Sequence, residues 1–271
     1  RGGADARRSV VLTFDDGGRD QLRAAEIMER HGFRGIFFVI PAVGSVSPGR
    51  MTPEDVRRLA RAGHRVAVHG YRHRSMVDSG AETAASVARS AGVLRERLPE
   101  RHPMHDFAFP FGHYTEEIAE AVGERYRYLH TVNPGYWDGR SPLVPRMLLA
   151  GEVPLAFYQE YLLGAGGYRP PAALLGPDGA SGDVLRFRLA GALPEGEIAM
   201  LSISADREGR MYSVHPLGDA ARVEGDTLVV ELREHLRRHF PPERRVVSYA
   251  LVTRTPAGIR YLTPGYSQWV E

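Results

Sequence analysis

The chain contains no cysteine and no lysine, and each absence excludes a class of chemistry. Without cysteine there can be no disulfide, no cysteine-ligated zinc and no thiol nucleophile. Without lysine there can be no Schiff-base mechanism and no lysine-containing phosphate-binding loop. All 35 basic residues are therefore arginines, and they are interspersed with 33 acidic residues. Because nucleic-acid binding needs clustered positive charge, we expect no nucleic-acid partner.

Long hydrophobic runs are also absent. No apolar stretch approaches the roughly 20 residues of a membrane-spanning helix. Residues 1–8 are too polar for the core of a secretory signal. We therefore expect a chain that does not span a membrane and carries no leader in this stretch. With 271 residues, 43% hydrophobic and 25% charged, the composition is that of a globular protein of one or two domains.

Residues 9–150 alternate between short apolar segments and segments with helical apolar spacing. The apolar segments predict strands at residues 9–14, 35–40, 65–69, 106–109, 126–132 and 144–149. The helical spacing predicts helices at residues 19–31, 52–63, 81–98 and 115–123, with a closing helix at 154–163. This alternation predicts a parallel sheet, open or closed into a barrel, with its chemistry at the C-terminal strand ends.

The second part of the chain has a different pattern. Glycine and proline dominate residues 164–171, which predicts a linker. Beyond it, short alternating segments predict strands at residues 184–189, 198–204, 246–253 and 259–262, with a helix at 232–240. We therefore expect an α/β domain over residues 1–165 and a smaller β-rich, sandwich-like domain over 166–271. The sequence assigns this second domain neither chemistry nor a protein partner.

Two adjacent carboxylates, Asp15 and Asp16, follow the first predicted strand. Neighbouring residues on an extended chain point to opposite sides, so one carboxylate can bind a metal while the other faces a substrate water. The glycines that follow let the backbone turn sharply. Taken alone, the same segment equally suits a helix N-cap before residues 19–31.

Two histidines, His69 and His73, follow the strand predicted at residues 65–69. If residues 70–74 turn as a helix, both imidazoles lie on one face, close enough to hold one ion. In isolation, they are equally consistent with two surface histidines. Together with Asp16 they form a set of two histidines and a carboxylate, which suits a hydrolytic metal site. The ligand types favour zinc, and cobalt, nickel and iron also suit them.

A rigid apolar turn, Phe109-Pro110-Phe111-Gly112, follows the strand predicted at residues 106–109. A backbone N–H in such a turn can face a developing oxyanion. A plain hydrophobic bend is the alternative. Further along the chain, Tyr136 and Trp137 are candidates for an aromatic wall against sugar rings.

Three segments, one at each of these strand ends, carry a resemblance to a known family. They are Thr13-Phe14-Asp15-Asp16-Gly17, His69-Gly70-Tyr71-Arg72-His73 and Phe107-Ala108-Phe109-Pro110-Phe111-Gly112. In order and rough spacing they resemble the first three motifs of the polysaccharide deacetylases of the NodB-homology type, carbohydrate esterase family 4. The third segment is most similar to that of the poly-β-1,6-N-acetylglucosamine deacetylases of biofilm exopolysaccharide systems.

The resemblance implies a deformed (β/α) barrel of about seven strands and metal-dependent removal of N-acetyl groups. It implies that Asp15 is the general base and that the metal ligands are Asp16, His69 and His73. The backbone N–H of Phe111 would stabilise the oxyanion, and Phe109 joins the aromatic candidates for substrate contact. The substrate class implies an extracellular, cell-surface or periplasmic location.

The chain departs from the family pattern at two places. Ala108 occupies the position where many members carry an arginine that orients the base, and Arg146 is the candidate to replace it, with a plain surface arginine as the alternative. No general-acid histidine stands in its usual sequence context. The histidines that remain as candidates for the general acid are His113, His130 and His215.

The leading interpretation is a metal-dependent hydrolase that removes N-acetyl groups from an N-acetylglucosamine polysaccharide such as poly-N-acetylglucosamine. A peptidoglycan or chitooligosaccharide deacetylase is the alternative within the same chemistry. A catalytically impaired glycan-binding or assembly protein is the alternative of another class, motivated by the missing acid histidine. A metal-dependent phosphatase or nuclease is disfavoured because the segments lack further carboxylates and phosphate-binding groups.

Overall fold

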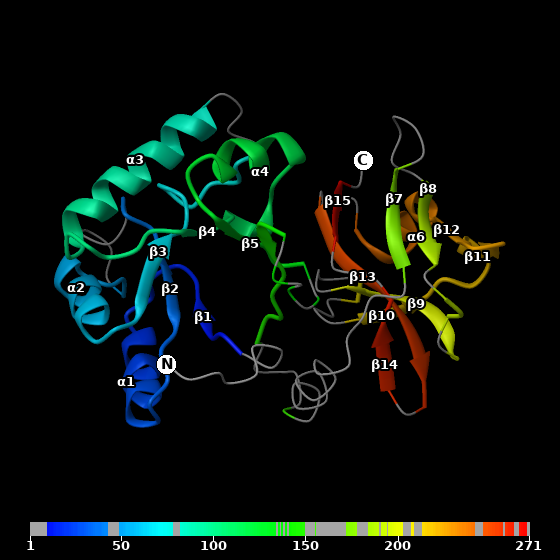
Figure 1. Ribbon diagram of the computed structural model, residues 1–271, viewed down its shortest axis with the longest axis horizontal. Helices are drawn as coiled ribbons and strands as arrows, with labels where there is room; N and C mark the ends of the chain where they lie inside the picture. The colour runs from blue at the N-terminus through cyan, green and yellow to red at the C-terminus, as the bar shows by residue number, and fades with distance from the viewer. Residues whose placement is uncertain are drawn as a thin grey trace. The chain divides into compact units, whose positions relative to one another are not determined.

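A computed structural model of the chain divides into two units, and each is described by itself (Figure 1). The first unit comprises residues 1–131 and 140–144, and the second comprises residues 132–139 and 145–271. The structure describes residues 10–42, 49–77, 82–133, 135, 137, 139, 141–149, 155, 172–177, 184–189, 191–193, 195–202, 207–208, 213–241, 246–256, 258–262 and 266–269.

The first unit is built on a curled sheet of six parallel strands in the order β1-β2-β3-β4-β5-β6. The strands are β1 (Thr13–Phe14), β2 (Ile36–Val39), β3 (Arg65–Val68), β4 (Asp106–Ala108), β5 (Tyr128–His130) and β6 (Leu143–Val144). Strand order follows chain order, so every strand ends at the same edge of the sheet. This arrangement agrees with the expected α/β class and with a deformed barrel; the described residues contribute six of its strands.

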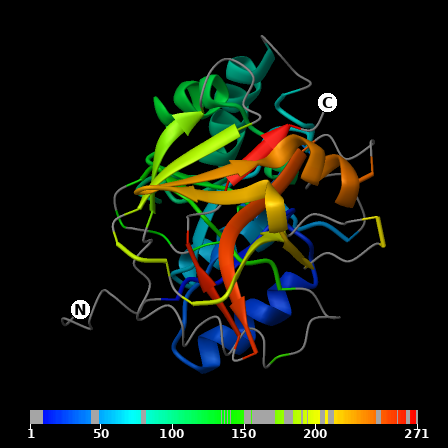
Figure 2. The ribbon, with the colours of Figure 1, turned by 90° about the vertical axis from the view of Figure 1, so that its right-hand side faces the viewer.

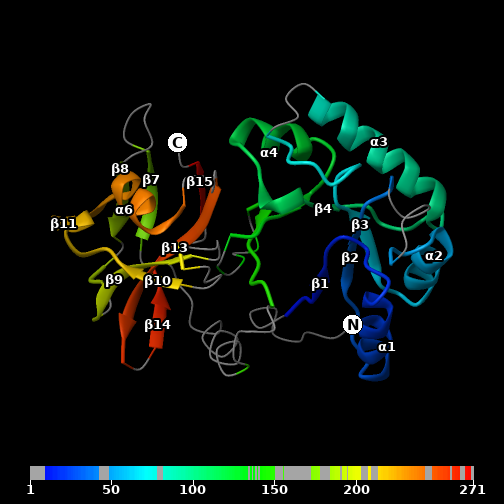
Figure 3. The ribbon, with the colours of Figure 1, turned by 180° about the vertical axis from the view of Figure 1, so that it is seen from behind.

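Four helices cover the outside of this sheet, each packed against the next (Figures 1 and 3). They are α1 (Gln21–Arg30), α2 (Pro53–Arg61), α3 (Glu82–Arg97) and α4 (Glu116–Gly123). All four were expected from helical apolar spacing. No helix in the described part of the chain combines the length and apolarity needed to cross a bilayer.

The sheet and helices enclose one hydrophobic core. Both central strands β2 and β3 are almost wholly buried, as their continuous apolar sequences require of strands covered on both faces. The ring of Phe37 stacks on that of Phe14 at 4.8 Å, and the Phe107 ring lies 5.4 Å from that of Phe109. The strand ends are therefore held by a packed interior.

The strands at both edges of the sheet are much shorter than expected. The segment expected at residues 9–14 pairs only through Thr13–Phe14, and the preceding Val10, Val11 and Leu12 are exposed. Of the last expected strand, residues 144–149, only Val144 pairs with β5, together with the preceding Leu143. Both are edge strands, where hydrophobic sequence alone does not set the length of the pairing.

The second unit contains a five-stranded and a four-stranded antiparallel sheet and a helix (Figure 2). Its elements are β7 (Ala172–Pro177), β8 (Val184–Leu189), β9 (Glu197–Ser202), β10 (Ser213–Pro216), β11 (Ala221–Glu224), β12 (Thr227–Glu231), α6 (Leu232–His239), β13 (Val246–Thr255), β14 (Gly258–Tyr261) and β15 (Tyr266–Trp269). The expected linker and all but Leu155 of the expected helix at residues 154–163 lie outside the described residues. The domain boundary after residue 165 stays a prediction.

Candidate metal centre and active site

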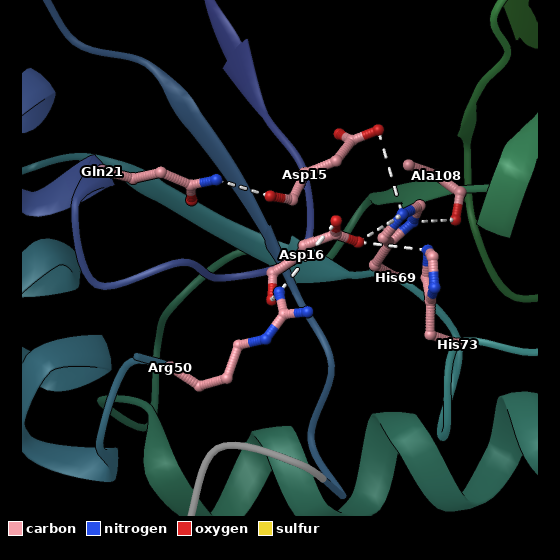
Figure 4. A network of polar contacts seen from close by, with 7 residues as sticks. All are labelled: Asp15, Asp16, Gln21, Arg50, His69, His73 and Ala108. Atoms are coloured by element: carbon pink, nitrogen blue, oxygen red, sulfur yellow. Dashed lines mark hydrogen bonds and ion pairs between the residues drawn. The ribbon is translucent and has the colours of Figure 1, made fainter. Parts of the chain in front are cut away.

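Three strand ends bring the segments singled out in the sequence to one edge of the first unit's sheet. Asp15 and Asp16 follow β1, His69 follows β3, and residues 109–112 follow β4. Because these strands are parallel, segments far apart in the sequence converge (Figure 4).

Asp16, His69 and His73 form a group that could hold a metal ion, with one ligand atom from each lying within 4.8 Å of the others. The carboxylate Oδ1 of Asp16 lies 3.1 Å from Nε2 of His73 and 3.5 Å from Nε2 of His69. This Oδ1 atom is buried and has no hydrogen-bond partner of good geometry in the described part of the chain. A buried oxygen without such a partner, facing two imidazole nitrogens, fits a cation between them.

The ring of His69 is held in place by a hydrogen bond through its Nδ1. Its Nδ1 lies 2.9 Å from the backbone carbonyl oxygen of Ala108, and the histidine is 2% exposed. A carbonyl oxygen only accepts hydrogen bonds, so Nδ1 carries the proton and donates it. Nε2 is then the nitrogen that faces the cluster. A histidine held through its other nitrogen in this way is the usual arrangement of a metal ligand.

The backbone around Asp16 is shaped by the segment before α2. Gly18 pairs with Arg50 in an antiparallel bridge, and Met51 N–H donates to the Gly17 carbonyl at 2.9 Å. The Arg50 guanidinium donates to the Asp16 carbonyl at 2.7 Å. Asp16 itself adopts a left-handed backbone with φ 75°, which turns its side chain toward the histidines.

The electrostatic surroundings keep the Asp16 carboxylate ionised. The close imidazole of His73 lowers the pKa of Asp16 below its usual value. Partial burial opposes this shift, and the positive charges of His73, His69 and Arg50 add to it. An ionised carboxylate is the form that binds a cation.

His73 reaches the cluster by a route that the sequence did not predict. Residues 71–73 form bends and no residue from 70 to 74 is helical, so the expected helical turn is wrong. Instead, Gly70 and His73 have left-handed backbones with φ 68° and 51°, and the rings of His69 and His73 come within 5.0 Å. A Cβ at Gly70 would lie 2.8 Å from Cγ of Pro110, so only glycine lets these two segments approach.

Asp15 lies at the side of the cluster. Its Oδ2 is 3.9 Å from Nε2 of His69, and its side chain is 27% exposed. The Gln21 side-chain amide donates to the Asp15 carbonyl at 2.6 Å, which ties the backbone of Asp15 to the first turn of α1. The carboxylate thus borders the metal ligands while remaining open to solvent.

Phe111 forms another wall of the cluster. Its ring lies 4.3 Å from that of His73 and its side chain is 55% exposed, although the residue is large and apolar. Its backbone is left-handed, with φ 59°. Phe109 is instead fully buried and stacks on Tyr114 at 4.8 Å. The prediction that Phe109 contacts substrate does not fit this placement, because a buried ring presents no surface.

The remaining sequence candidates, Tyr136, Trp137 and Arg146, belong to the second unit, which is described by itself. Tyr136 lies outside the described residues. Trp137 is 43% exposed, and Arg146 donates its backbone N–H to the Asn133 carbonyl at 3.0 Å. Both belong to the second unit. Their contacts with substrate and with Asp15 stay predictions.

The three histidines considered as candidates for the general acid lie in different environments. His130 is buried, and its Nε2 lies 2.9 Å from Oδ1 of Asp106, which places it in the interior of the first unit. His113 has Nδ1 3.2 Å from Ser75 Oγ, and its ring is 5.7 Å from that of Phe111. His215 belongs to the second unit. Of the two in the first unit, His113 contacts a residue that borders the cluster.

Sequence reasoning missed two residues that position the carboxylates. Gln21 is the first residue of α1, and its six-residue separation from Asp15 is a weak signal for the hydrogen bond. Arg50 is 34 residues from Asp16 and has no local signal at all. Its position depends on the bridge with Gly18, which only the fold creates.

Comparison with known proteins gives one family match. A model of the polysaccharide deacetylase family matches residues 2–127, which lie within the first unit. A chitooligosaccharide deacetylase of Bradyrhizobium sp. (strain ANU 289) is 31% identical over 156 residues, covering 55% of this chain and 68% of that protein.

Solved structures are similar to this chain at lower identity. The Streptococcus pyogenes deacetylase PplD, in complex with acetate, is similar with a TM-score of 0.52 and 20% identity, over 57% of this chain and 71% of that chain. IcaB from Ammonifex degensii gives a TM-score of 0.48 and 22% identity, over 58% of this chain and 72% of that chain. At these identities, only the likeness of fold to PplD enters the argument.

Proposed function

This chain belongs to the polysaccharide deacetylase family, and we propose that it removes N-acetyl groups from a polysaccharide of N-acetylglucosamine. The reaction is hydrolysis of a linear amide. The observation that carries the proposal is the convergence of Asp16, His69 and His73, with Asp15 at their side. Two imidazoles and one carboxylate leave coordination positions open, as a hydrolytic centre requires.

Asp16 Oδ1 and the Nε2 atoms of His69 and His73 are the ligands we assign to a divalent ion. The buried Oδ1, which faces Nε2 of both histidines, and the donation from His69 Nδ1 to Ala108 support this assignment. Zinc fits the ligand types best, and cobalt, nickel and iron also suit them. When bound, such an ion supplies Lewis acidity that polarises the acetamide carbonyl and lowers the pKa of the attacking water.

Asp15 acts as general base in this proposal. Its partly exposed carboxylate takes a proton from water as the water oxygen attacks the acetyl carbon. The backbone N–H of Phe111 faces the developing oxyanion, and its exposed ring borders the substrate. Breaking the C–N bond then requires a proton for the departing amine. We propose that Asp15 gives the proton it took from water to the departing amine, which leaves free amine and acetate.

Three more residues, Arg146, Trp137 and Tyr136, have proposed roles in the site. Arg146 orients Asp15 in place of the arginine that other members carry at the position of Ala108. The exposed ring of Trp137, together with Tyr136, stacks on sugar rings. These contacts assume a catalytic domain of residues 1–165 and an accessory β-rich domain of residues 166–271.

The polymer is proposed to be an exopolysaccharide such as poly-β-1,6-N-acetylglucosamine. The similarity of the segment at residues 107–112 to that subgroup supports this choice. A β-1,4-linked chitooligosaccharide is the second candidate, supported by the 31% identical relative from Bradyrhizobium. Either polymer places the enzyme outside the cytoplasmic membrane.

The proposal is tested by acetate release from a panel of β-1,4- and β-1,6-linked N-acetylglucosamine oligomers. We expect release that stops when metal is removed by a chelator and returns with zinc or cobalt. Asp15→Asn should lower release at least ~100-fold while the protein keeps its metal, because general-base catalysis contributes at least this factor. His69→Ala should lose both the metal and the activity.

Two outcomes would redirect the assignment. Oligomer binding without acetate release at any added metal would favour the catalytically impaired glycan-binding protein. Unchanged acetate release from Asp15→Asn would refute the assigned base. The matched control is His105→Gln, which alters an exposed histidine of the same unit and should change neither activity nor metal content.

A further inference from the structure

Arg50 contacts Asp16 at two points, although the two residues are 34 positions apart in the sequence (Figure 4). Its guanidinium Nη1 donates to the Asp16 backbone carbonyl at 2.7 Å. The same nitrogen lies 4.0 Å from Oδ2 of the Asp16 carboxylate. One arginine nitrogen therefore faces both the backbone and the side chain of Asp16, and the proposed reaction gives this arginine no role.

The two oxygens of the Asp16 carboxylate have different surroundings. Oδ1 is buried and lies 3.1 Å from Nε2 of His73 and 3.5 Å from Nε2 of His69. Oδ2 is the oxygen that lies toward Arg50. The carboxylate thus presents one oxygen to the two imidazoles and the other to a positive charge of the protein itself.

The distances indicate that Oδ1 is the oxygen placed to bind an ion. Atoms that bind the same ion at about 2.0–2.2 Å lie roughly 3–3.5 Å from one another. Oδ1 has this spacing to both histidine nitrogens. A carboxylate can also bind a metal through both of its oxygens. The second oxygen would then occupy a coordination position that a hydrolytic centre keeps open for water or substrate.

The backbone that carries Arg50 is held independently of the Arg50 side chain. The N–H of Met51 donates to the Gly17 carbonyl at 2.9 Å, and the N–H of Arg19 donates to the Gly49 carbonyl at 2.8 Å. The Met51 side chain is 2% exposed and packs in the core of the first unit. Truncating Arg50 should therefore remove the two contacts with Asp16 while the segment keeps its place.

We propose that Arg50 is a positioning residue that limits Asp16 to one metal-binding oxygen, Oδ1; this inference rests on the proposed function. The hydrogen bond to the carbonyl holds the left-handed backbone of Asp16, at φ 75°, and so fixes where its side chain begins. The positive charge attracts Oδ2 and keeps it from the ion. An arginine suits this role because its guanidinium stays charged at all relevant pH values.

The experiment is infrared difference spectroscopy of the full chain, with zinc bound minus zinc-free. The antisymmetric and symmetric carboxylate stretching bands are far apart when one oxygen binds a metal and close together when both do. All samples carry Asp15→Asn, which removes the neighbouring carboxylate from the difference spectrum. We expect a wide separation with Arg50 present and a narrower one after Arg50→Ala. A narrow separation with Arg50 present would overturn the proposal without any Arg50 variant.

The matched control is Arg19→Ala, on the strand segment that pairs with the one carrying Arg50. Arg19 is 64% exposed and lies 3.9 Å from Asp55, so its removal should leave the wide separation unchanged. The same wide separation in Arg50→Ala would show that Arg50 does not set the binding mode, and the deacetylase assignment would stand. Failure of the protein with Arg50 present to bind zinc at all would instead overturn the metal centre, and the role of Arg50 with it.

Discussion

Asp16, His73 and Phe111 are the residues other than glycine with a left-handed backbone in the described part of the chain, and all three border the candidate metal centre. Their φ angles are 75°, 51° and 59°. Each such residue costs of order 1–3 kcal/mol and persists only where its surroundings enforce it. At Asp16 the enforcement comes from Arg50 and the bridge to Gly18, and at His73 from the bend that begins at Gly70. The strain is therefore concentrated where ligand positions are set.

Gly70→Ala tests this dependence at one residue. The added Cβ would meet Pro110 at 2.8 Å with the backbone at φ 68°, so we expect a loss of about 1–3 kcal/mol in the free energy of unfolding. Metal affinity and acetate release should fall with it, because His73 is displaced. Urea unfolding and metal titration provide the measurements.

The matched control for Gly70→Ala is Gly92→Ala. Gly92 lies within α3, and a Cβ there would meet no atom within 4 Å. Replacing glycine by alanine in a helix should stabilise the protein by about 0.5–1 kcal/mol. A Gly70→Ala protein as stable and active as Gly92→Ala would show that the close approach to Pro110 does not matter.

For single residues, the sequence predicted the grouping of Asp16, His69 and His73 better than the contacts that support it. Asp16, His69 and His73 were predicted because polar residues directly after apolar strands meet at one edge of a parallel sheet. Arg50 could not be predicted, since its contact with Asp16 spans 34 positions and depends on tertiary pairing. Phe109 was misassigned because a strand-end phenylalanine can point into the core or toward solvent, and the sequence alone does not distinguish them.

Among the elements, α2 has the most complete N-terminal cap. Thr52 Oγ1 accepts the Asp55 N–H at 3.2 Å, while Thr52 N–H donates to Asp55 Oδ2 at 2.9 Å. The helix buries Val56 and Leu59, and it leads into β3, at whose end His69 lies. Threonine followed by proline is a sequence signal for a helix start, because threonine is a good N-cap and proline suits the first helical turn.

Thr52→Ala should lower the free energy of unfolding by about 1 kcal/mol, because one helix N–H loses its acceptor. Thr52→Ser keeps the hydroxyl and should lose far less. Paired urea titrations of the two variants measure the difference. Equal stability of the two proteins would show that the cap contributes nothing.

The bounds of strands and turns were predicted less well where contacts between distant segments set them. The apolar residues 10–12 extend the pattern of β1, but its pairing with β2 begins only at Thr13. His69 and His73 are four residues apart, as two residues on one face of a helix would be, and yet the segment between them bends. Its path follows from the proximity of Pro110, a residue 40 positions away from Gly70.

For the whole molecule, buried histidines set the response to acid. His64 is 1% exposed and its Nδ1 accepts the Gly35 N–H at 3.1 Å, while His102 Nε2 accepts the Val66 N–H at 3.0 Å. Burial lowers the pKa of both below the usual value of 6.5. The folded protein therefore binds fewer protons than the unfolded chain between the folded pKa and 6.5.

The sign of the pH dependence follows from this difference. Stability contributed by the neutral rings is fully present above pH 6.5 and falls as pH drops below that value. We expect the urea midpoint of the first unit to decrease steadily on acidification, and the slope to lessen in His64→Gln. A midpoint that is constant or rises between pH 7 and pH 5 would contradict this assignment.

The two halves of the chain differed in how far sequence could predict them. The parallel sheet of the first unit was predicted because its strands and helices alternate with clear periodicity. In the second unit, strands at residues 184–189 and 246–253 were expected, but the order of strands in its two sheets was not. Antiparallel pairings between distant segments, such as β9 with β13, leave no local trace.

The central claim is that Asp16, His69 and His73 hold one divalent ion beside Asp15. Anomalous diffraction at the zinc edge from crystals of the full chain grown with zinc tests it most directly. We predict a peak about 2.0–2.2 Å from Asp16 Oδ1 and from Nε2 of both histidines, with the Asp15 carboxylate outside the coordination sphere. No peak there, or a peak bound by Asp15 in place of one of these ligands, would contradict it.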